Sequence, residues 1–176
     1  ILLPQKTIDM AQWSVIACDQ FTSEPEYWKE VRQTVGKMPS TLDMIFPEVY
    51  LEQEDYEERL KNINASMTDY LEKKIFTEYK DAMIYVERTD SVGNVRAGIV
   101  GKIDLEQYDY SKKSTSLIRA TEATVAERIP TRVEIRKNAV VEIPHIMLLI
   151  DDAGEYVIEP CKKEKQHLPL LYDFDL

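Results

Sequence analysis

The feature that most constrains the fold is a long amphipathic stretch over residues 54–74. Apolar side chains recur there at spacings of three and four, at Tyr56, Leu60, Ile63, Met67 and Leu71. This period places them along one face of an α-helix, and the opposite face carries acidic and polar residues. The stretch therefore predicts a surface helix whose apolar face lies on a core.

A second helix is predicted over residues 25–35. Ser23 suits its N-cap, Pro25 suits its first turn, and Gly36 suits its end. Apolar residues recur at helical spacing between these signals, at Tyr27, Trp28, Val31 and Val35. We interpret them as a stripe that faces the core. Residues 38–50 hold two prolines and predict an irregular connection.

Short apolar runs between turn signals predict the strands. A buried strand is expected at residues 13–18. A first hairpin is expected to pair residues 81–88 with residues 95–104 around a turn at 91–94. A second is expected to pair residues 145–150 with residues 155–159 around a turn at 151–154. Gly98 and Gly101 in the second of these strands predict a bulge or a close backbone approach.

These elements predict a mixed α/β fold that is α+β-like in character. Its largely antiparallel sheet, built from β-hairpins, would be covered by two or three helices. A single domain is expected over residues 1–160, with residues 161–176 as a tail that leads into a further C-terminal region.

The charge balance excludes several classes of partner. Lys and Arg number 22 against 32 Asp and Glu, which gives a formal charge of −10. Such a field repels the phosphates of nucleic acids and of anionic membranes, so we expect neither as a partner. No signal peptide is recognisable and no apolar run is long enough to span a membrane. The lone cysteines Cys18 and Cys161 form neither a disulfide framework nor a metal motif, which indicates a reducing cytoplasm.

The arginine stretch, residues 119–136, is the strongest candidate for a site. Its sequence RATEATVAERIPTRVEIR contains four arginines in an otherwise acidic chain. A helix over residues 130–141 would begin at Pro130 and would place Arg132 and Arg136 on one face. One interpretation is an anion site, in which the helix N-terminus adds N–H donors to side chains of the stretch. These candidate ligands are Arg119, Thr121, Thr124, Arg128, Arg132 and Arg136. The alternative is a set of salt bridges to Glu122, Glu127 and Glu134.

Three further positions have a functional and a structural interpretation. Asp19, beside Cys18, follows the first predicted strand and would serve as a base or metal ligand, or as a turn residue. His145 would serve as a general acid–base, or as a hydrogen-bonded core histidine. Asp151 and Asp152 would hold Mg²⁺ beside a phosphate, or form a hairpin turn. The sequence holds no Walker A, GxGxxG, HExxH, GxSxG or CxxC motif.

Two segments resemble a known family. SLIRATEATVAERIPTRVEIRKNAVVEIPHIMLLIDD and WSVIACDQFTSEPEYW are similar to the bacterial and archaeal family called domain of unknown function 1015. The resemblance covers nearly the whole chain and implies that it is the N-terminal part of longer members, continuing past LPLLYDFDL. The family's arginine, glutamate, threonine and downstream arginine correspond to Arg119, Glu122, Thr124 and Arg128. The resemblance brings no settled activity with it.

Our functional hypothesis is an intracellular enzyme domain that binds a small phosphate- or carboxylate-bearing molecule. Phosphoryl or nucleotidyl transfer is the expected reaction class, with Mg²⁺ as the candidate cofactor, because catalysis there consists mostly of positioning and charge stabilisation. Glu122 would orient the arginines or act as a base, and Asp19 and His145 are the other candidate catalytic residues. The alternative is a non-catalytic scaffold or interaction domain. Its arginines would form internal salt bridges, and its tail would pack on a C-terminal domain or on a second copy.

Overall fold

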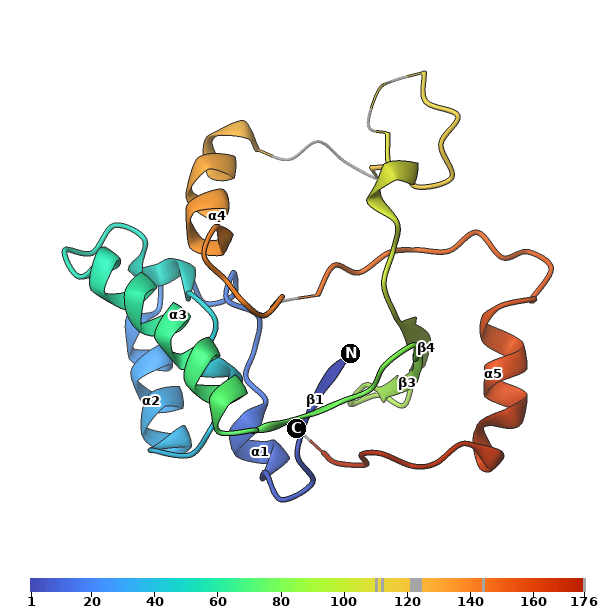
Figure 1. The fold of residues 1–176 in the computed structure, drawn as a ribbon, viewed down its shortest axis with the longest axis horizontal. Helices are drawn as coiled ribbons and strands as arrows, with labels where there is room; N and C mark the ends of the chain where they lie inside the picture. The colour runs from blue at the N-terminus through green and yellow to red at the C-terminus, as the bar shows by residue number, and fades with distance from the viewer. Residues whose placement is uncertain (110, 112, 121–124, 144, 176) are drawn as a thin grey trace. The chain divides into compact units, whose positions relative to one another are not determined.

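The computed structural model describes residues 1–109, 111, 113–120, 125–143 and 145–175 (Figure 1). The chain forms two compact units. The helical unit comprises Leu2–Tyr79, Val133–Leu149 and Leu170–Leu176, and the hairpin unit comprises Ile1, Lys80–Arg132 and Ile150–Pro169. The expected single domain over residues 1–160 stays a prediction.

Both units combine helices with antiparallel strands. In the helical unit β1 (Leu2–Pro4) pairs with β2 (Phe76–Glu78), and in the hairpin unit β3 (Ile84–Thr89) pairs with β4 (Val95–Val100). Each of these sheets has two strands, and helical segments make up most of the other regular structure. The predicted mixed α/β class with antiparallel pairing is confirmed.

Helix α2 (Pro25–Val35) confirms the second predicted helix. It begins at Pro25, whose fixed φ suits a first helical turn, and ends at Gly36, which takes φ 61°. Trp28 and Val35 are buried. The residue at the N-cap position is Glu24, without a side-chain capping bond, so the predicted cap at Ser23 is wrong.

Helix α3 (Tyr56–Glu72) confirms the long amphipathic helix. Its buried residues are Leu60, Ile63, Met67 and Tyr70. Leu71 lies at the edge of this stripe, and 38% of it is exposed. The last place on the core face therefore belongs to Tyr70, three residues after Met67.

The connecting segment, residues 38–50, runs between α2 and α3 and is the most buried irregular part of the chain. It contains two short 3-10 turns, η1 (Thr41–Asp43) and η2 (Glu48–Tyr50), so the predicted irregular connection is confirmed. Ser40, Leu42, Met44, Ile45 and Phe46 are buried in it. Met44 and Phe46 join the apolar face of α3, and Leu42 and Ile45 join Trp28 and Val35. The segment therefore contributes to both hydrophobic clusters of the helical unit.

The predicted buried strand at residues 13–18 is wrong. Trp13 ends a short helix, α1 (Met10–Trp13), which Asp9 caps by accepting a hydrogen bond from the Ala11 N–H at 2.9 Å. Residues 14–17 have no regular structure. The Trp13 carbonyl accepts hydrogen bonds from the hydroxyls of Ser40 and Thr41 at 3.1 and 2.8 Å, so distant residues anchor this segment without a strand.

The hairpin of β3 and β4 confirms the first predicted hairpin. Its pairing runs without interruption from Ile84 with Val100 to Thr89 with Val95. The Asp90 carboxylate accepts hydrogen bonds from the N–H groups of Val92 and Asn94 and so fixes the turn. Gly98 pairs in register and has open space at its Cβ position, so the predicted bulge or close approach is wrong there.

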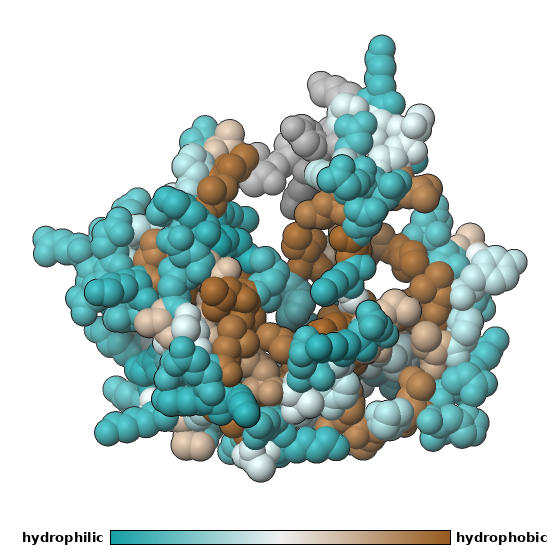
Figure 2. All heavy atoms as spheres, viewed as in Figure 1, coloured by the Kyte–Doolittle hydropathy of each residue, from teal (hydrophilic) through white to brown (hydrophobic). Residues whose placement is uncertain are grey.

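The second predicted hairpin, at residues 145–159, is wrong. Residues 145–150 form no strand and are exposed, with Ile146 and Leu149 each 83% exposed. Asp152 instead accepts hydrogen bonds from the Tyr156 and Val157 N–H groups, just before α5 (Ile158–Glu164) begins. Figure 2 shows apolar side chains, drawn brown, among hydrophilic ones on the viewed face. The apolar run at residues 145–150 thus predicted a strand that the structure does not contain.

Candidate functional site

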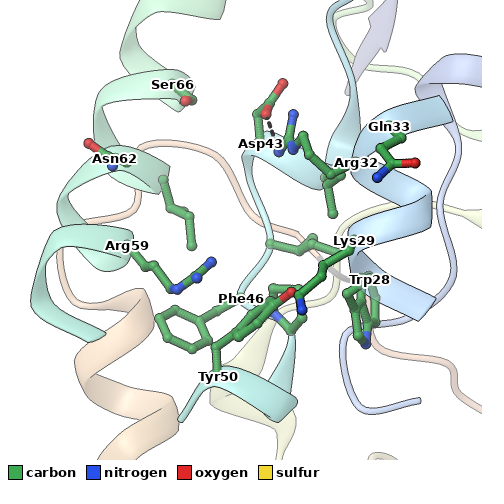
Figure 3. Close-up of a pocket in the computed structure, with 14 residues that line it drawn as sticks. Trp28, Lys29, Arg32, Gln33, Asp43, Phe46, Tyr50, Arg59, Asn62 and Ser66 are labelled. Atoms are coloured by element: carbon green, nitrogen blue, oxygen red, sulfur yellow. Dashed lines mark hydrogen bonds and ion pairs between the residues drawn. The ribbon is translucent and has the colours of Figure 1, made fainter. Parts of the chain in front are cut away.

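A cavity of about 530 Å³ lies in the helical unit, between α2, α3 and the connecting segment (Figure 3). Seven of the described residues that line it are polar: Lys29, Arg32, Gln33, Asp43, Arg59, Asn62 and Ser66. Its apolar lining comes from Trp28, Leu42, Ile45, Phe46, Pro47, Tyr50 and Ile63. This cavity is our candidate site.

Helical periodicity explains why these side chains share one cavity. On α3, Arg59, Asn62 and Ser66 are three and four residues apart, which puts them on one face beside the buried stripe. On α2, Lys29 and Arg32 are three residues apart and lie next to the buried Trp28. Each helix thus presents cations at the margin of its apolar stripe.

Asp43 connects the cavity to the buried core. One carboxylate oxygen accepts a hydrogen bond from Arg32 Nη2 at 2.7 Å, and the other accepts one from the Tyr70 hydroxyl at 2.6 Å. The Tyr70 oxygen also accepts the backbone N–H of the fully buried Ser40 at 3.0 Å. Burial, followed by the bond to Asp43, raises the pKa of Tyr70. The hydroxyl therefore stays protonated and holds Asp43 in place for Arg32.

Arg59 projects from α3 across the aromatic side of the cavity (Figure 3). Its Nη2 pairs with Asp55 at 2.8 Å, a hydrogen bond that lowers the pKa of Asp55. Its Cζ lies 3.8 Å from the ring centroid of Tyr50, at cation–π distance. Its Nε is buried and has no hydrogen-bond partner among the described residues. Because 38% of the side chain is exposed, other N–H groups of the Arg59 guanidinium remain as donors at the cavity.

Lys29 is the third cation of the lining. Its Nζ pairs with Glu26 at 2.6 Å, and this hydrogen bond raises the pKa of Lys29. Both side chains are largely exposed, so the pair contributes little to stability. The described lining thus holds three cations against the single carboxylate of Asp43. Glu26 and Asp55, the partners of Lys29 and Arg59, are outside the lining, so the lining itself carries more cations than carboxylates.

Comparison with known proteins decides the family. The family model DUF1015, described as a protein of unknown function, matches residues 2–176. The chain belongs to the DUF1015 family. No curated protein and no solved structure matches it significantly. The resemblance inferred from the sequence is confirmed, and the cavity supplies the structural basis for a functional proposal in this DUF1015 chain.

The structure places the arginine stretch on both sides of the boundary between the units. Arg119, Arg128 and Arg132 belong to the hairpin unit and are exposed, and Arg136 belongs to the helical unit. Arg119 Nε donates to the Ser116 carbonyl at 2.7 Å. Helix α4 (Ile129–Arg136) contains the boundary and ends five residues before the predicted end at residue 141.

Of the acids expected to neutralise this stretch, Glu134 has another partner and Glu122 lies outside the described residues. Arg136 forms an ion pair with Glu142, and Glu134 pairs with Lys137 at 3.3 Å. The predicted ligands Thr121 and Thr124 and the predicted base Glu122 lie outside the described residues. The anion site proposed for the stretch therefore stays a prediction.

Asp19 and His145 both lie in the helical unit, in different settings from those expected. Asp19 is exposed, and one of its oxygens accepts a hydrogen bond from Gln20 Nε2 at 3.3 Å. It follows an irregular segment, so the argument that it stands at the end of a strand is wrong. His145 is exposed and in no strand, so its placement in a buried strand is also wrong. Their catalytic roles remain predictions.

Neither a metal-binding cluster nor a membrane-spanning helix is found in the described part of the chain. Among those residues, no group of three or more His, Cys, Asp or Glu side chains is arranged to hold a metal ion. No described helix is both long and apolar enough to cross a membrane.

The cavity residues were not predicted from the sequence. The polar face of the long helix was interpreted as solvated, and the second helix was interpreted only through its apolar stripe. The available signal was the helical spacing of Arg59 with Asn62 and Ser66, and of Lys29 with Arg32. Spacing alone does not show that the two faces adjoin one cavity, because that depends on how the connecting segment packs.

Proposed function

We propose that this DUF1015 protein binds a small phosphate- or carboxylate-bearing molecule in the cavity between α2 and α3. The observation that supports the proposal most strongly is the convergence of Arg32 and Arg59 from two helices on one cavity. Guanidinium groups match the geometry of carboxylates and phosphates because their N–H donors form a planar fork. The volume also lies in the range of small-molecule sites, about 300–1,000 Å³.

Arg59 also has donors for a bound anion. It uses Nη2 for Asp55 and 38% of its side chain is exposed, so other N–H groups of the guanidinium remain for a ligand oxygen. Arg32 is about half exposed and uses one N–H for Asp43, so other donors remain for an oxygen from the ligand.

For the reaction class we retain phosphoryl or nucleotidyl transfer, with Mg²⁺ as the cofactor to test. Such chemistry depends mainly on holding and neutralising phosphate oxygens, which an arginine-lined cavity suits. Anion binding by the arginine stretch, residues 119–136, is a separate part of this proposal. We place the protein in the cytoplasm of a bacterium or archaeon, and expect neither nucleic acid nor membrane as a partner. The support is the formal charge of −10 and the fact that neither Cys18 nor Cys161 is in a disulfide.

A specific observation favours a second candidate function, a non-catalytic scaffold. Each cation of the cavity already has a carboxylate partner: Asp43 for Arg32, Asp55 for Arg59 and Glu26 for Lys29. If these pairs satisfy the cations, the cavity would only separate two structural helices.

Thermal unfolding of the chain with and without inorganic phosphate, and with Mg²⁺ present or absent, separates the two functions. A ligand that binds only the folded state adds RT ln(1 + [L]/Kd), or about 2.7 kcal/mol at a hundredfold excess over Kd. We expect a phosphate-dependent rise in Tm that is lost in Arg32→Ala and Arg59→Ala. It should persist in Lys73→Ala, which removes an ion-paired cation at the C-cap of α3, outside the cavity lining. An unchanged Tm for the unmodified chain, with phosphate or carboxylates, supports the scaffold.

A further inference from the structure

The lining of the cavity combines aromatic rings with charged side chains. In the view of Figure 3, Trp28, Phe46 and Tyr50 lie in the lower part, and Arg32 and Asp43 lie in the upper part. A ligand that fills both regions must itself have a flat or apolar part and an anionic part. An inorganic ion would contact only the cations and leave the aromatic rings of the cavity without a ligand contact.

Arg59 is placed to connect these two regions. One face of its guanidinium rests on Tyr50, with Cζ 3.8 Å from the ring centroid, and the ion pair with Asp55 at 2.8 Å fixes its direction. Yet 38% of the Arg59 side chain remains exposed, although it lines the cavity. A planar guanidinium has two faces, so a second ring can stack on the face that Tyr50 does not cover.

We propose that the ligand is an aromatic anion whose ring stacks on Arg59, opposite Tyr50, while its phosphate or carboxylate reaches Arg32. The anionic half of this statement rests on the proposed function, and the aromatic half is new. A saturated ring of the same size would gain the apolar contact but lose the attraction between the cation and the π face. An aromatic ring should therefore raise affinity by on the order of tenfold over a saturated ring.

Titration calorimetry with phenyl phosphate and cyclohexyl phosphate tests the aromatic half directly. The unmodified chain should bind phenyl phosphate about tenfold more tightly than cyclohexyl phosphate. Arg59→Lys keeps the positive charge but removes the planar guanidinium on which the ring would stack. The two ligands should then bind almost equally, and the affinity for cyclohexyl phosphate should change little. Lys73→Arg, at the C-cap of the same helix and outside the cavity lining, is the control and should leave the ratio of the two affinities unchanged.

The outcomes distinguish the two proposals. If both phosphates bind the unmodified chain equally well, the aromatic inference is overturned and anion binding stands. If neither binds, both proposals are overturned. If the preference for phenyl phosphate survives in Arg59→Lys, stacking on Arg59 is overturned. Circular dichroism confirms that each variant is folded. Tyr50→Leu provides a second test, because loss of the supporting ring should reduce the same ratio.

Discussion

Tyr70→Phe tests the polar network that supports the cavity. The Tyr70 hydroxyl donates to Asp43 at 2.6 Å and accepts the Ser40 N–H at 3.0 Å, and Asp43 in turn holds Arg32. Phenylalanine keeps the ring and removes only the hydroxyl. The substitution should therefore leave the apolar packing of α3 in place while breaking both hydrogen bonds.

The expected loss follows from the burial of the two partners. Ser40 is fully buried, so its N–H would be left without a partner, at a cost of about 1–3 kcal/mol. Asp43 keeps its bond to Arg32 and is partly exposed, so losing the second bond should cost less, about 0.5–1.5 kcal/mol. We expect the free energy of unfolding to fall by roughly 1.5–4.5 kcal/mol in total.

Urea denaturation followed by fluorescence and circular dichroism measures this change. Tyr27→Phe is the matched control, since the structure shows no hydrogen bond from its hydroxyl to a described residue and its ring stacks on Phe21. The control should change stability by less than about 0.5 kcal/mol. A loss for Tyr70→Phe as small as that of the control would refute the network.

The raised pKa of Tyr70 adds a pH dependence with a defined sign. The folded state holds this proton more tightly than the unfolded state, so the contribution to stability is complete below the unfolded pKa of about 10. It should be lost as the pH rises above that value towards the folded pKa. Tyr70→Phe should therefore lose less stability between pH 9 and pH 11 than the unmodified chain.

Three further predictions concern the core, a helix end and the cavity. Met44→Ala should lower the free energy of unfolding, measured in urea, by about 2–5 kcal/mol, because Met44 is only 1% exposed. A change below about 1 kcal/mol would contradict the burial of Met44 in the core. Gly36→Ala should lower the free energy of unfolding by about 1–3 kcal/mol, since φ 61° is strained for alanine although its Cβ has space. An unchanged midpoint of urea unfolding would argue against this backbone conformation. Asp43→Asn should tighten inorganic phosphate binding by roughly fivefold in calorimetry, because it removes the carboxylate that competes for Arg32, and weaker binding would contradict this role.

Local signals predicted the elements whose boundaries depend on their own residues. Pro25 and Gly36 delimit α2, and the spacing of Leu60, Ile63 and Met67 identifies α3. The β3–β4 hairpin follows from two strand-like runs around a short polar turn. In each case the decisive residues lie within one element or its immediate neighbours, so the sequence contains the required information.

The two failed strand predictions share one physical reason. The runs at residues 13–18 and 145–150 are apolar, but a strand also needs a partner strand, and no local signal shows whether one is present. Trp13 is buried through contacts with the connecting segment instead. The cavity was missed for the same reason. The faces that carry Arg32 and Arg59 are recognisable, but their convergence depends on long-range packing.

The most direct test of the central claim is a phosphate titration followed by NMR of the arginine Nε–H signals. If the cavity between α2 and α3 binds the anion, the signals of Arg32 and Arg59 should shift and saturate together at one dissociation constant. Saturable shifts confined to Arg119 and Arg128, with those of Arg32 and Arg59 unmoved, would contradict the account and place the anion in the arginine stretch.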